Sequence, residues 1–479
     1  MMSTRMITPD DGSSSFGSTA SAAATALDLD MIRKYAVPGP RYTSYPPANK
    51  FHDRLDEVDV GQGIAADNAD SARPLSLYFH LPFCESRCWY CGCTTIITRR
   101  KDWADEYERD LEREMEVVGR QLNPQRLVDQ LHFGGGTPTF FAPEVLTKLG
   151  ESIHRRFSFA ADAELSVEID PRCATPEHLA ALKSIGINRA SLGIQDTNPE
   201  VQEAIHRIQP HDTNRRVVDG LRSIGIDSVN LDLIYGLPLQ TPDSVERTVD
   251  DALELSPARL SVFSYAHVPW IKPAQRIFDK RGQMPGPAEK LEMFSRIRAK
   301  LLAAGYVDIG LDHFARPDDE LAIALREGKL HRNFQGYSTR SGASLYGFGI
   351  SSISQSNDIY WQNHKSLMEY RAALNEGRLP VERGYRLTAE DKRRRRLVMA
   401  VMCDRRLDFA PLSAEFGIDV AQTYAEEIAR LQPLQADGLV EVSADGIRVL
   451  PKGEPLLRVV AMAFDQTLSR GVRAHAMTV

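Results

Sequence analysis

Apolar and polar positions follow two alternating patterns through the middle of the chain. Short apolar runs are separated by longer stretches in which apolar residues recur every three or four positions. The first pattern predicts strands, and the second predicts amphipathic helices. The predicted strands cover residues 75–80, 130–133, 163–169, 189–194, 228–234, 259–264 and 307–312. The predicted helices cover residues 102–121, 143–157, 176–185, 213–224, 242–255 and 287–304.

This alternation is typical of parallel sheets, because a helix carries the chain back to the start of the next strand. Six or seven such units fit a barrel or a partial barrel. We therefore predict an α/β fold, a partial (β/α)6-type parallel barrel over residues 61–365. In β/α barrels the active site gathers at the carboxyl ends of the strands, so the residues that follow each strand are the first candidates for chemistry.

The two ends of the chain have a different character. Residues 1–28 are rich in Ser, Ala, Thr and Gly, and we expect a disordered extension. Residues 29–60 are expected to form a segment over the barrel mouth. Residues 366–479 predict a mainly helical, winged-helix-like domain. Its helices are expected at 389–404, 411–416, 420–435 and 454–468, and a hairpin at 439–450.

Composition and charge narrow the possible classes of function. The chain is 42% hydrophobic and 26% charged, with a net charge of −7, which is typical of a globular enzyme. No run of about 18 apolar residues occurs, so no membrane span is expected. A basic run, KRRRR at 392–396, together with the winged-helix-like end could indicate nucleic-acid binding. The acidic balance and the acids that flank the run favour a solvated helix face or a source of internal salt bridges instead.

Three closely spaced cysteines are the most informative feature of the chain. Cys84, Cys88 and Cys91 have the spacing C-x3-C-x2-C. Three thiolates can hold three corners of a cubane iron–sulfur cluster and leave one iron open, whereas an electron-transfer cluster takes four cysteines. An open metal position is where a small molecule can bind. A zinc knuckle is the alternative, but it usually needs a second cysteine pair, and a disulfide framework does not suit so long a chain.

Other polar and glycine residues follow or interrupt the predicted strands. The run GGG at 134–136 follows a strand, and it is either a ligand-binding loop or a plain tight turn. Glu168 and Asp232 interrupt apolar strands, where they could accept hydrogen bonds from a ribose or form structural ion pairs. Arg207 could bind a ligand carboxylate. Tyr90, between the cysteines, could stack on an adenine ring or shield a cluster.

Longer motifs support a family resemblance. The C-x3-C-x2-C spacing is that of radical S-adenosylmethionine (SAM) enzymes. From about residue 32 to 465 the chain resembles the oxygen-independent coproporphyrinogen III oxidase (coproporphyrinogen dehydrogenase) family. The stretches that carry this resemblance are GPRYTSYP (39–46), YFHLPFCESRCWYCGC (78–93), LHFGGGTPTF (131–140), LIYGLPLQTP (233–242), YAHVP (265–269), DHFARPDDELAIA (312–324) and HRNFQGYST (331–339).

The resemblance implies a set of site residues and cofactors. It implies a 4Fe–4S cluster held by Cys84, Cys88 and Cys91, and two SAM molecules beside it. The residues implied around the first SAM are Tyr78, Gly135, Glu168 and Ile353. Those implied around the second are Tyr90, Gly136, Thr137, Gln195, Arg207, Asp232 and Ala266. Cys93 and Gln335 match residues implicated near the reaction centre, and a direct ligand role for Cys93 stays open.

The resemblance also implies an activity, partners and a compartment. The implied reaction converts two propionates of coproporphyrinogen III into vinyl groups and yields protoporphyrinogen IX in haem biosynthesis. Hydrogen abstraction by a deoxyadenosyl radical begins it. Arg41, Arg316 and Arg332 are candidates for gripping propionates. We expect a reductant such as a flavodoxin or ferredoxin, no nucleic acid, a monomer and a cytoplasmic location. The alternatives are a haem chaperone without oxidase activity and a zinc-dependent nucleic-acid-binding module.

Overall fold

The structure is a computed structural model that describes residues 28–282 and 284–468. Its main sheet has the strand order β16-β15-β14-β13-β1-β4-β5-β6-β7-β8-β10-β9. The parallel centre consists of β13 (Ser344–Phe348), β1 (Leu75–Leu81), β4 (Val128–Gly135), β5 (Phe159–Ile169), β6 (Arg189–Gln195), β7 (Ser228–Tyr235) and β8 (Arg259–Ser264). Antiparallel strands extend both edges, namely β9 (Val307–Gly310), β10 (His313–Ala315), β14 (Ile353–Gln355), β15 (Ile359–Asn363) and β16 (Val381–Arg386).

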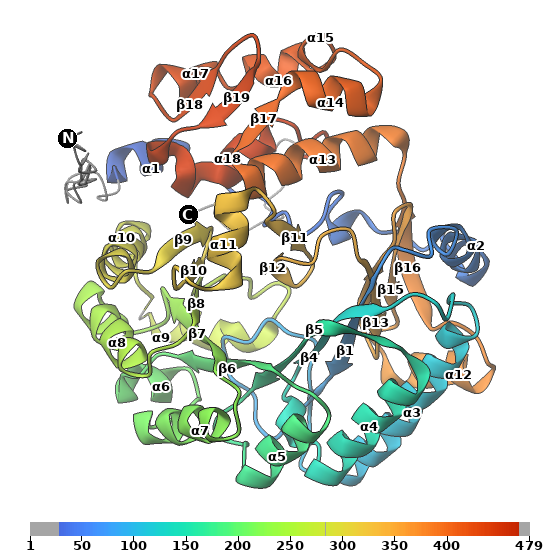
Figure 1. Ribbon diagram of the computed structural model, residues 1–479. Helices are drawn as coiled ribbons and strands as arrows, with labels where there is room; N and C mark the ends of the chain where they lie inside the picture. Colours follow the sequence, from blue (N-terminus) through green and yellow to red (C-terminus); the bar gives the residue numbers. More distant parts are fainter. Residues whose placement is uncertain (1–27, 283, 469–479) are drawn as a thin grey trace, which may run out of the picture.

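Crossover helices cover the outside of this curved sheet (Figure 1). They are α3 (Asp102–Gly119), α4 (Pro143–Arg156), α5 (Pro176–Ser184), α6 (Pro199–Ala204), α7 (His211–Ser223), α8 (Pro242–Glu254) and α10 (Pro287–Ala303). Sequence signals set their starts, since α5 and α8 each begin with a Thr-Pro pair whose threonine caps the first turn. The predicted α/β fold with a large parallel sheet is confirmed.

One predicted parallel strand was wrong. The run at 307–312 does not continue the barrel, because Gly310 has a φ of 135° and Leu311 a φ of 53°, and these positive values turn the chain. The run therefore divides into β9 and the turn before β10, and β10 pairs with β8 in the antiparallel sense. The place of a seventh parallel strand goes to β13, which lies beside β1 and whose residues are all buried.

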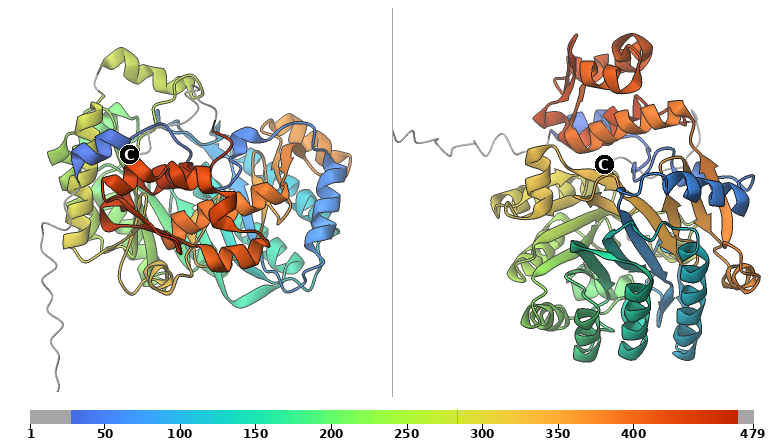
Figure 2. Two further views of the ribbon diagram at one scale, coloured as in Figure 1. Left: turned by 90° about the horizontal axis from the view of Figure 1, so that it is seen from above. Right: turned by 45° about the vertical axis from the view of Figure 1, so that its right-hand side comes forward.

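The C-terminal region is helical, as predicted, and lies over the gap between the two edges of the sheet (Figures 1 and 2). Its helices are α13 (Ala389–Asp404), α14 (Phe409–Phe416), α15 (Val420–Thr423), α16 (Ala425–Ala429), α17 (Gln432–Ala436) and α18 (Leu457–Met462). A three-stranded sheet has the order β17 (Arg406–Asp408), β19 (Gly446–Val449) and β18 (Val440–Val442).

Two predicted helices of this region are shorter or broken. The stretch 420–435 forms three short helices, interrupted at Tyr424 and before Pro433, because proline lacks the N–H that a helix interior needs. The last predicted helix starts as a 3-10 helix, Pro451–Leu456, that contains Pro455, and continues as α18 only to Met462.

The remaining elements connect the barrel and the C-terminal region. They are α1 (Leu29–Tyr35), α2 (Glu57–Asp67), β2 (Phe83–Cys84), β3 (Ile96–Ile97), α9 (Arg276–Arg281), α11 (Glu320–Glu327), β11 (His331–Asn333), β12 (Gly336–Ser338) and α12 (Leu367–Asn375), with 3-10 helices at Ala48–Lys50, Pro138–Phe140 and Pro273–Gln275. The predicted boundary at residue 365 lies between β15 and α12, and β16, which follows it, still belongs to the main sheet. Residues 1–27 of the predicted extension lie outside the described residues.

The N-terminal segment 39–46, with the sequence GPRYTSYP, joins the two halves of the molecule. The Tyr42 hydroxyl donates to Asp465 at 2.9 Å, and the Tyr360 hydroxyl donates to the Tyr45 carbonyl at 3.1 Å. Ile32, Tyr42 and Tyr45 belong to the same hydrophobic core as the C-terminal helices. This segment is therefore held between the barrel and the C-terminal region.

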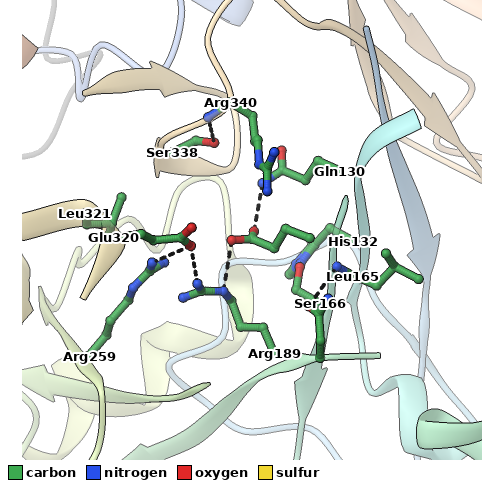
Figure 3. Close-up of polar contacts among 12 residues, drawn as sticks. Gln130, His132, Leu165, Ser166, Arg189, Arg259, Glu320, Leu321, Ser338 and Arg340 are labelled. Carbon is green, nitrogen blue, oxygen red and sulfur yellow. Dashed lines mark hydrogen bonds and ion pairs between the residues drawn. The ribbon is translucent and has the colours of Figure 1, made fainter. Parts of the chain in front are cut away.

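An ion-pair network fills the amino ends of the central strands. Glu164 of β5 pairs with Arg189 of β6 at 3.0 Å and accepts a hydrogen bond from Gln130 at 2.9 Å. Figure 3 shows Arg189 and Arg259 both turned toward Glu320, with which they form ion pairs. Although burial favours the neutral form of Glu164, the positive charges of Arg189 and Arg259 lower its pKa to about 2.

Replacing Glu164 by Gln is expected to lower the free energy of unfolding of the apo-protein by about 3 kcal/mol at pH 7, because buried guanidinium groups lose their counter-charge. An unfolded glutamate has a pKa of about 4.3, and the folded value is depressed. Its contribution is therefore complete above that pH and is lost as the pH falls toward 2. Urea titrations of wild type and variant should converge in this acid range. Glu254→Gln, which removes an exposed partner of Arg215, should cost less than about 1 kcal/mol at either pH.

Candidate functional site

A cavity of about 370 Å³ lies at the carboxyl ends of the parallel strands. The cysteine loop, the glycine loop and the ends of β5, β6 and β7 form its wall. Many predicted site residues line it: Cys84, Cys88, Tyr90, Cys91, Cys93, Gly135, Gly136, Thr137, Glu168, Gln195, Arg207 and Asp232. Residues from distant parts of the sequence therefore meet at the end of the sheet where β/α barrels place their chemistry.

The glycine loop holds the start of the cysteine loop in place. The Gly136 amide donates to the Leu81 carbonyl at 2.8 Å, and the Thr137 amide donates to the Phe83 carbonyl at 2.9 Å. The Thr137 hydroxyl lies 3.3 Å from the Cys84 sulfur. These bonds extend the β1–β4 pairing past the end of the sheet, so the position of the first cysteine depends on the loop after β4.

Two positions of the glycine loop leave no space for a side chain. A Cβ at Gly136 would come within 2.6 Å of the Pro82 carbonyl, which is backbone and cannot move aside easily. Gly135 has a φ of 116° and would place a Cβ 2.7 Å from the His80 ring. The close approach of the two loops therefore requires glycine here.

Guanidinium groups face the middle cysteine. Arg207 and Arg172 each donate to the Cys88 sulfur at 3.6 Å. Asp170 holds both arginines, at 3.0 Å from Arg207 and 2.7 Å from Arg172. Arg207 also donates to the Gly193 carbonyl at 2.7 Å. This network places positive charge against a position where a thiolate would carry negative charge.

The three candidate ligand thiols lie in different electrostatic surroundings. Burial raises the pKa of Cys84 to about 12. A hydrogen bond from Cys93 is the main reason why the pKa of Cys91 falls to about 6. Cys93 therefore lies beside a proposed ligand, and its thiol is a donor to that ligand.

The two strand carboxylates face the same cavity. Glu168 accepts a hydrogen bond from the Gly135 amide at 3.0 Å and contacts His132 at 3.5 Å. Burial opposes ionisation of Glu168, but these partners lower its pKa overall. Asp232 accepts from Ser191 at 2.9 Å and from Asn230 at 2.8 Å, yet burial, with the charge of Glu168, raises its pKa to about 7.

Four predicted site residues lie outside the cavity wall. Tyr78 stacks on His132, which in turn contacts Glu168. Its hydroxyl also shares a hydrogen bond with the His80 ring at 3.0 Å. Ile353 lies against Gly347, which pairs with Tyr78 in the sheet. A Cβ added at Gly347 would come within 2.7 Å of the Ile353 carbonyl oxygen.

The other two lie further along the chain. Ala266 is exposed in the loop after β8. Gln335 forms the β11–β12 turn, where its amide nitrogen is buried without a hydrogen-bond partner among the described residues.

The three candidate arginines for substrate occupy different places. Arg41 forms an ion pair with Asp312 and stacks over Phe263, which lines the cavity. Arg332 is buried and donates to the carbonyls of Arg41 and Tyr42 at 3.3 Å. Arg316 is exposed and pairs with Asp318. Its amide donates to the Ala258 carbonyl, just before the amino end of β8, whereas the cavity lies at the carboxyl ends of the strands, so Arg316 was wrong as a candidate.

Asp170 and Arg172 are site residues that the sequence reasoning missed. Asp170 directly follows β5, and Arg172 comes two residues later. The sequence did contain a signal for them, because they follow a predicted strand, as the glycine loop and Gln195 do. The ion pair between Asp170 and Arg207 connects residues 37 positions apart, which no local pattern shows.

The residues present fit the cofactors that the motifs imply. Three thiols, two guanidinium groups and a close-packed glycine loop surround one cavity, and these supply metal ligands, counter-charge and room for a cofactor. Across residues 28–282 and 284–468, no three His, Cys, Asp or Glu side chains converge closely enough to hold a single metal ion. No helix in these ranges is long and apolar enough to cross a membrane.

Comparisons with known proteins agree with this geometry. Residues 78–252 match the family model of the Radical SAM superfamily, and residues 387–456 match that of the HemN C-terminal domain. The oxygen-independent coproporphyrinogen III oxidase of Pseudomonas aeruginosa is 44% identical over 444 residues, covering 92% of this chain and 96% of that protein. The protein of the same description from Escherichia coli K12 is 45% identical over 446 residues, covering 93% and 96%. A solved structure, coproporphyrinogen III oxidase (HemN) from Escherichia coli, matches with a TM-score of 0.88 at 43% identity, covering 93% of this chain and 100% of that chain.

Proposed function

Because the chain belongs to the oxygen-independent coproporphyrinogen III oxidase family of radical SAM enzymes, we propose that it oxidatively decarboxylates two propionates of coproporphyrinogen III. The product would be protoporphyrinogen IX, with two vinyl groups, in haem biosynthesis. The single observation that carries the proposal is the cavity in which Cys84, Cys88 and Cys91 meet the glycine loop and Arg207.

The cofactors of this family are a 4Fe–4S cluster and SAM. We propose that Cys84, Cys88 and Cys91 hold the cluster and that two SAM molecules share the cavity. When bound, these cofactors supply a radical that removes a hydrogen from a propionate side chain. Glycine-loop amides and the carboxylates Glu168 and Asp232 would hold SAM through its polar groups.

The chain's own residues position charge and protons around this chemistry. Asp170 fixes Arg207 and Arg172 against Cys88, so the guanidinium groups stabilise the ligand thiolate. The Cys93 thiol donates a hydrogen bond to the Cys91 sulfur, which keeps a proton donor beside the cavity. The amide nitrogen of Gln335 has no hydrogen-bond partner among the described residues, and we propose that it contacts the substrate.

The substrate carries four propionates, so its site needs cations. Arg41 is the best placed candidate, because it stacks on Phe263 at the cavity wall. Burial and the nearby charges of Arg332 and Arg458 lower its pKa to about 9, which leaves it protonated at neutral pH. A crowded cation of this kind is stabilised when a carboxylate arrives.

Replacing Arg41 by Ala is expected to raise the KM for coproporphyrinogen III about tenfold or more, because a charge-assisted contact to a propionate is lost. Release of deoxyadenosine in the absence of substrate should stay within twofold of wild type. Steady-state assays with varied substrate measure the first, and chromatography of the nucleoside measures the second. Arg316→Ala, a surface arginine at the other end of β8, is the matched control. An unchanged KM in the Arg41 variant would remove this residue from the substrate site.

The test of the function is anaerobic reconstitution with iron and sulfide, followed by dithionite, SAM and coproporphyrinogen III. Formation of both deoxyadenosine and protoporphyrin is the expected result. The assay also needs a one-electron acceptor, because each propionate radical that loses carbon dioxide must give up one electron to become a vinyl group. With the acceptor present, deoxyadenosine without any decarboxylated product would reject the proposed substrate. Haem transfer without turnover would instead indicate the haem chaperone.

Partners and location belong to the same proposal. The cluster needs a one-electron reductant, and we propose a flavodoxin or ferredoxin. The oxygen sensitivity of such a cluster favours the cytoplasm. We further propose that the chain acts as a monomer without nucleic acid, in line with its net charge of −7.

A further inference from the structure

A second cavity, of about 480 Å³, lies between α13, the β14–β15 edge and the N-terminal segment. Arg73 and Ala343, which line it, precede β1 and β13, whereas the cysteine loop follows β1. The two cavities therefore lie toward opposite ends of β1. Their walls meet where Arg332, which lines the second, donates to the carbonyl of Arg41, which stacks over Phe263 in the first. The reaction proposed for the first cavity gives this second one no role.

The basic run 392–396 forms one wall of this cavity. Helical geometry divides the run, because residues at spacings of three and four share one face. Lys392, Arg395, Arg396 and Met399 line the cavity, and Arg393, next to this face, also reaches its wall. Arg394, in the middle of the run, turns instead to Glu390 and Glu427. The sequence interpretation of this run was a solvated face or a source of internal salt bridges, and the ion pairs of Arg394 confirm the second form.

The cavity has a surplus of positive charge. Six Lys and Arg side chains line it, against two acidic ones, Asp404 and Glu415. Lys392 is neutralised by Asp358, and Arg396 by Glu415 at 3.3 Å. Arg395 has only neutral partners among the described residues, the Tyr360 hydroxyl at 3.0 Å and the Asn357 carbonyl at 3.4 Å.

Arg332 adds a buried charge without a counter-ion. It is 2% exposed, and its hydrogen bonds go to the carbonyls of Arg41 and Tyr42. One terminal nitrogen of its guanidinium has no hydrogen-bond partner within the described part of the chain. A buried cation without an acidic partner is costly, and an anion held in the adjoining cavity would offset that cost.

The rest of the wall is apolar or aromatic. Leu330, Met399, Phe416 and the Tyr360 ring line the cavity together with the cations. A wall of this kind favours an organic body over a bare inorganic ion. Arg332 and Arg395, whose partners among the described residues are all neutral, match a ligand with at least two carboxylates.

We propose that this cavity is a second ligand site, which binds an organic anion with two or more carboxylates on an apolar body. Propionate-bearing tetrapyrroles are of this class, and the choice of them as ligand rests on the proposed function. Arg395 provides the accessible charge, and Phe416 and Met399 provide the apolar contact.

The test is equilibrium dialysis of the reconstituted enzyme against coproporphyrin III, a stable tetracarboxylate. Two molecules per chain are expected for the wild type and one for Arg395→Glu. Phe416→Ser, which removes the apolar contact and leaves the charge, is expected to weaken the second site about tenfold. Arg448→Glu makes the same charge change at an exposed residue of β19, and this variant should still bind two porphyrin molecules. Thermal melts establish that each variant is folded.

Two results would overturn the proposal. One is a single bound porphyrin in the wild type that Arg395→Glu does not change. The other is displacement of the second porphyrin by an equal concentration of inorganic phosphate, which would indicate a site for simple anions. Failure of the proposed function is a separate result, because it appears as absence of protoporphyrin formation whatever the number of bound molecules. Turnover by Arg395→Glu should stay within twofold of wild type.

Discussion

Replacing Cys84 by Ala is expected to abolish turnover and cluster assembly together. Cys84 ends β2 and its sulfur lies 3.3 Å from the Thr137 hydroxyl, so the loop after β4 fixes its place at the cavity wall. Reconstituted wild type should hold about four irons per chain, whereas the variant with two remaining ligands should hold fewer than about one. Iron and sulfide analysis, visible absorption and deoxyadenosine formation measure the effect. Wild-type iron content in the variant would return the three cysteines to another role.

Two other cysteines give matched controls for this prediction. Cys403 is 4% exposed in α13, within the C-terminal core, and its replacement by Ala should leave iron content and turnover close to wild type. Cys93 lies beside Cys91, and its replacement by Ala separates two roles. Retained iron with reduced turnover would indicate a residue that acts near the reaction. Lost iron would support Cys93 as a direct ligand.

The parallel part of the fold could be predicted because the spacing of apolar residues in each strand differs from that in the helices around it. The predicted strand at 259–264 matches β8, and β1, β4, β5, β6 and β7 extend their predicted ranges by only a few residues. The parallel strand β13, with five residues, was not predicted. The strands β11, β12 and β14 have three residues each, which is too short for a period to appear. The turn at Gly310 and Leu311 depends on backbone angles that a sequence pattern does not show.

The candidate site could be predicted where its chemistry is local in the sequence. The cysteine loop and the glycine loop are short motifs, and their residues do line one cavity. Asp170 was missed because its importance comes from ion pairs with Arg172 and with Arg207, 37 residues away. Arg316 was chosen from a motif, although its strand runs antiparallel and places it at the opposite end of the sheet. Strand direction was the missing information.

Replacing Arg207 by Gln is expected to reduce turnover about a hundredfold and to destabilise the apo-protein by about 3 kcal/mol. Arg207 is 6% exposed and joins Cys88, Asp170 and the Gly193 carbonyl, so its loss leaves a buried carboxylate with one partner fewer. The cluster should still assemble, because all three thiols remain. Its midpoint potential should become more negative, since a positive charge beside it has been removed. Redox titration followed by electron paramagnetic resonance measures that shift, and urea titration measures the stability.

The variant Arg172→Gln distinguishes the effect of Arg172 from that of Arg207, since both arginines pair with Asp170. Arg172 also donates to the Cys88 sulfur at 3.6 Å, but it is more exposed than Arg207 and, within the described part of the chain, lacks the bond to β6 that Arg207 makes at Gly193. Its replacement should therefore shift the potential in the same direction with a smaller loss of stability, because Arg207 still neutralises Asp170 at 3.0 Å. Equal effects from the two variants would mean that charge near Cys88 is all that matters. A potential unchanged in both would show that neither guanidinium tunes the cluster, and would leave Arg207 with a purely structural role between β5 and β6.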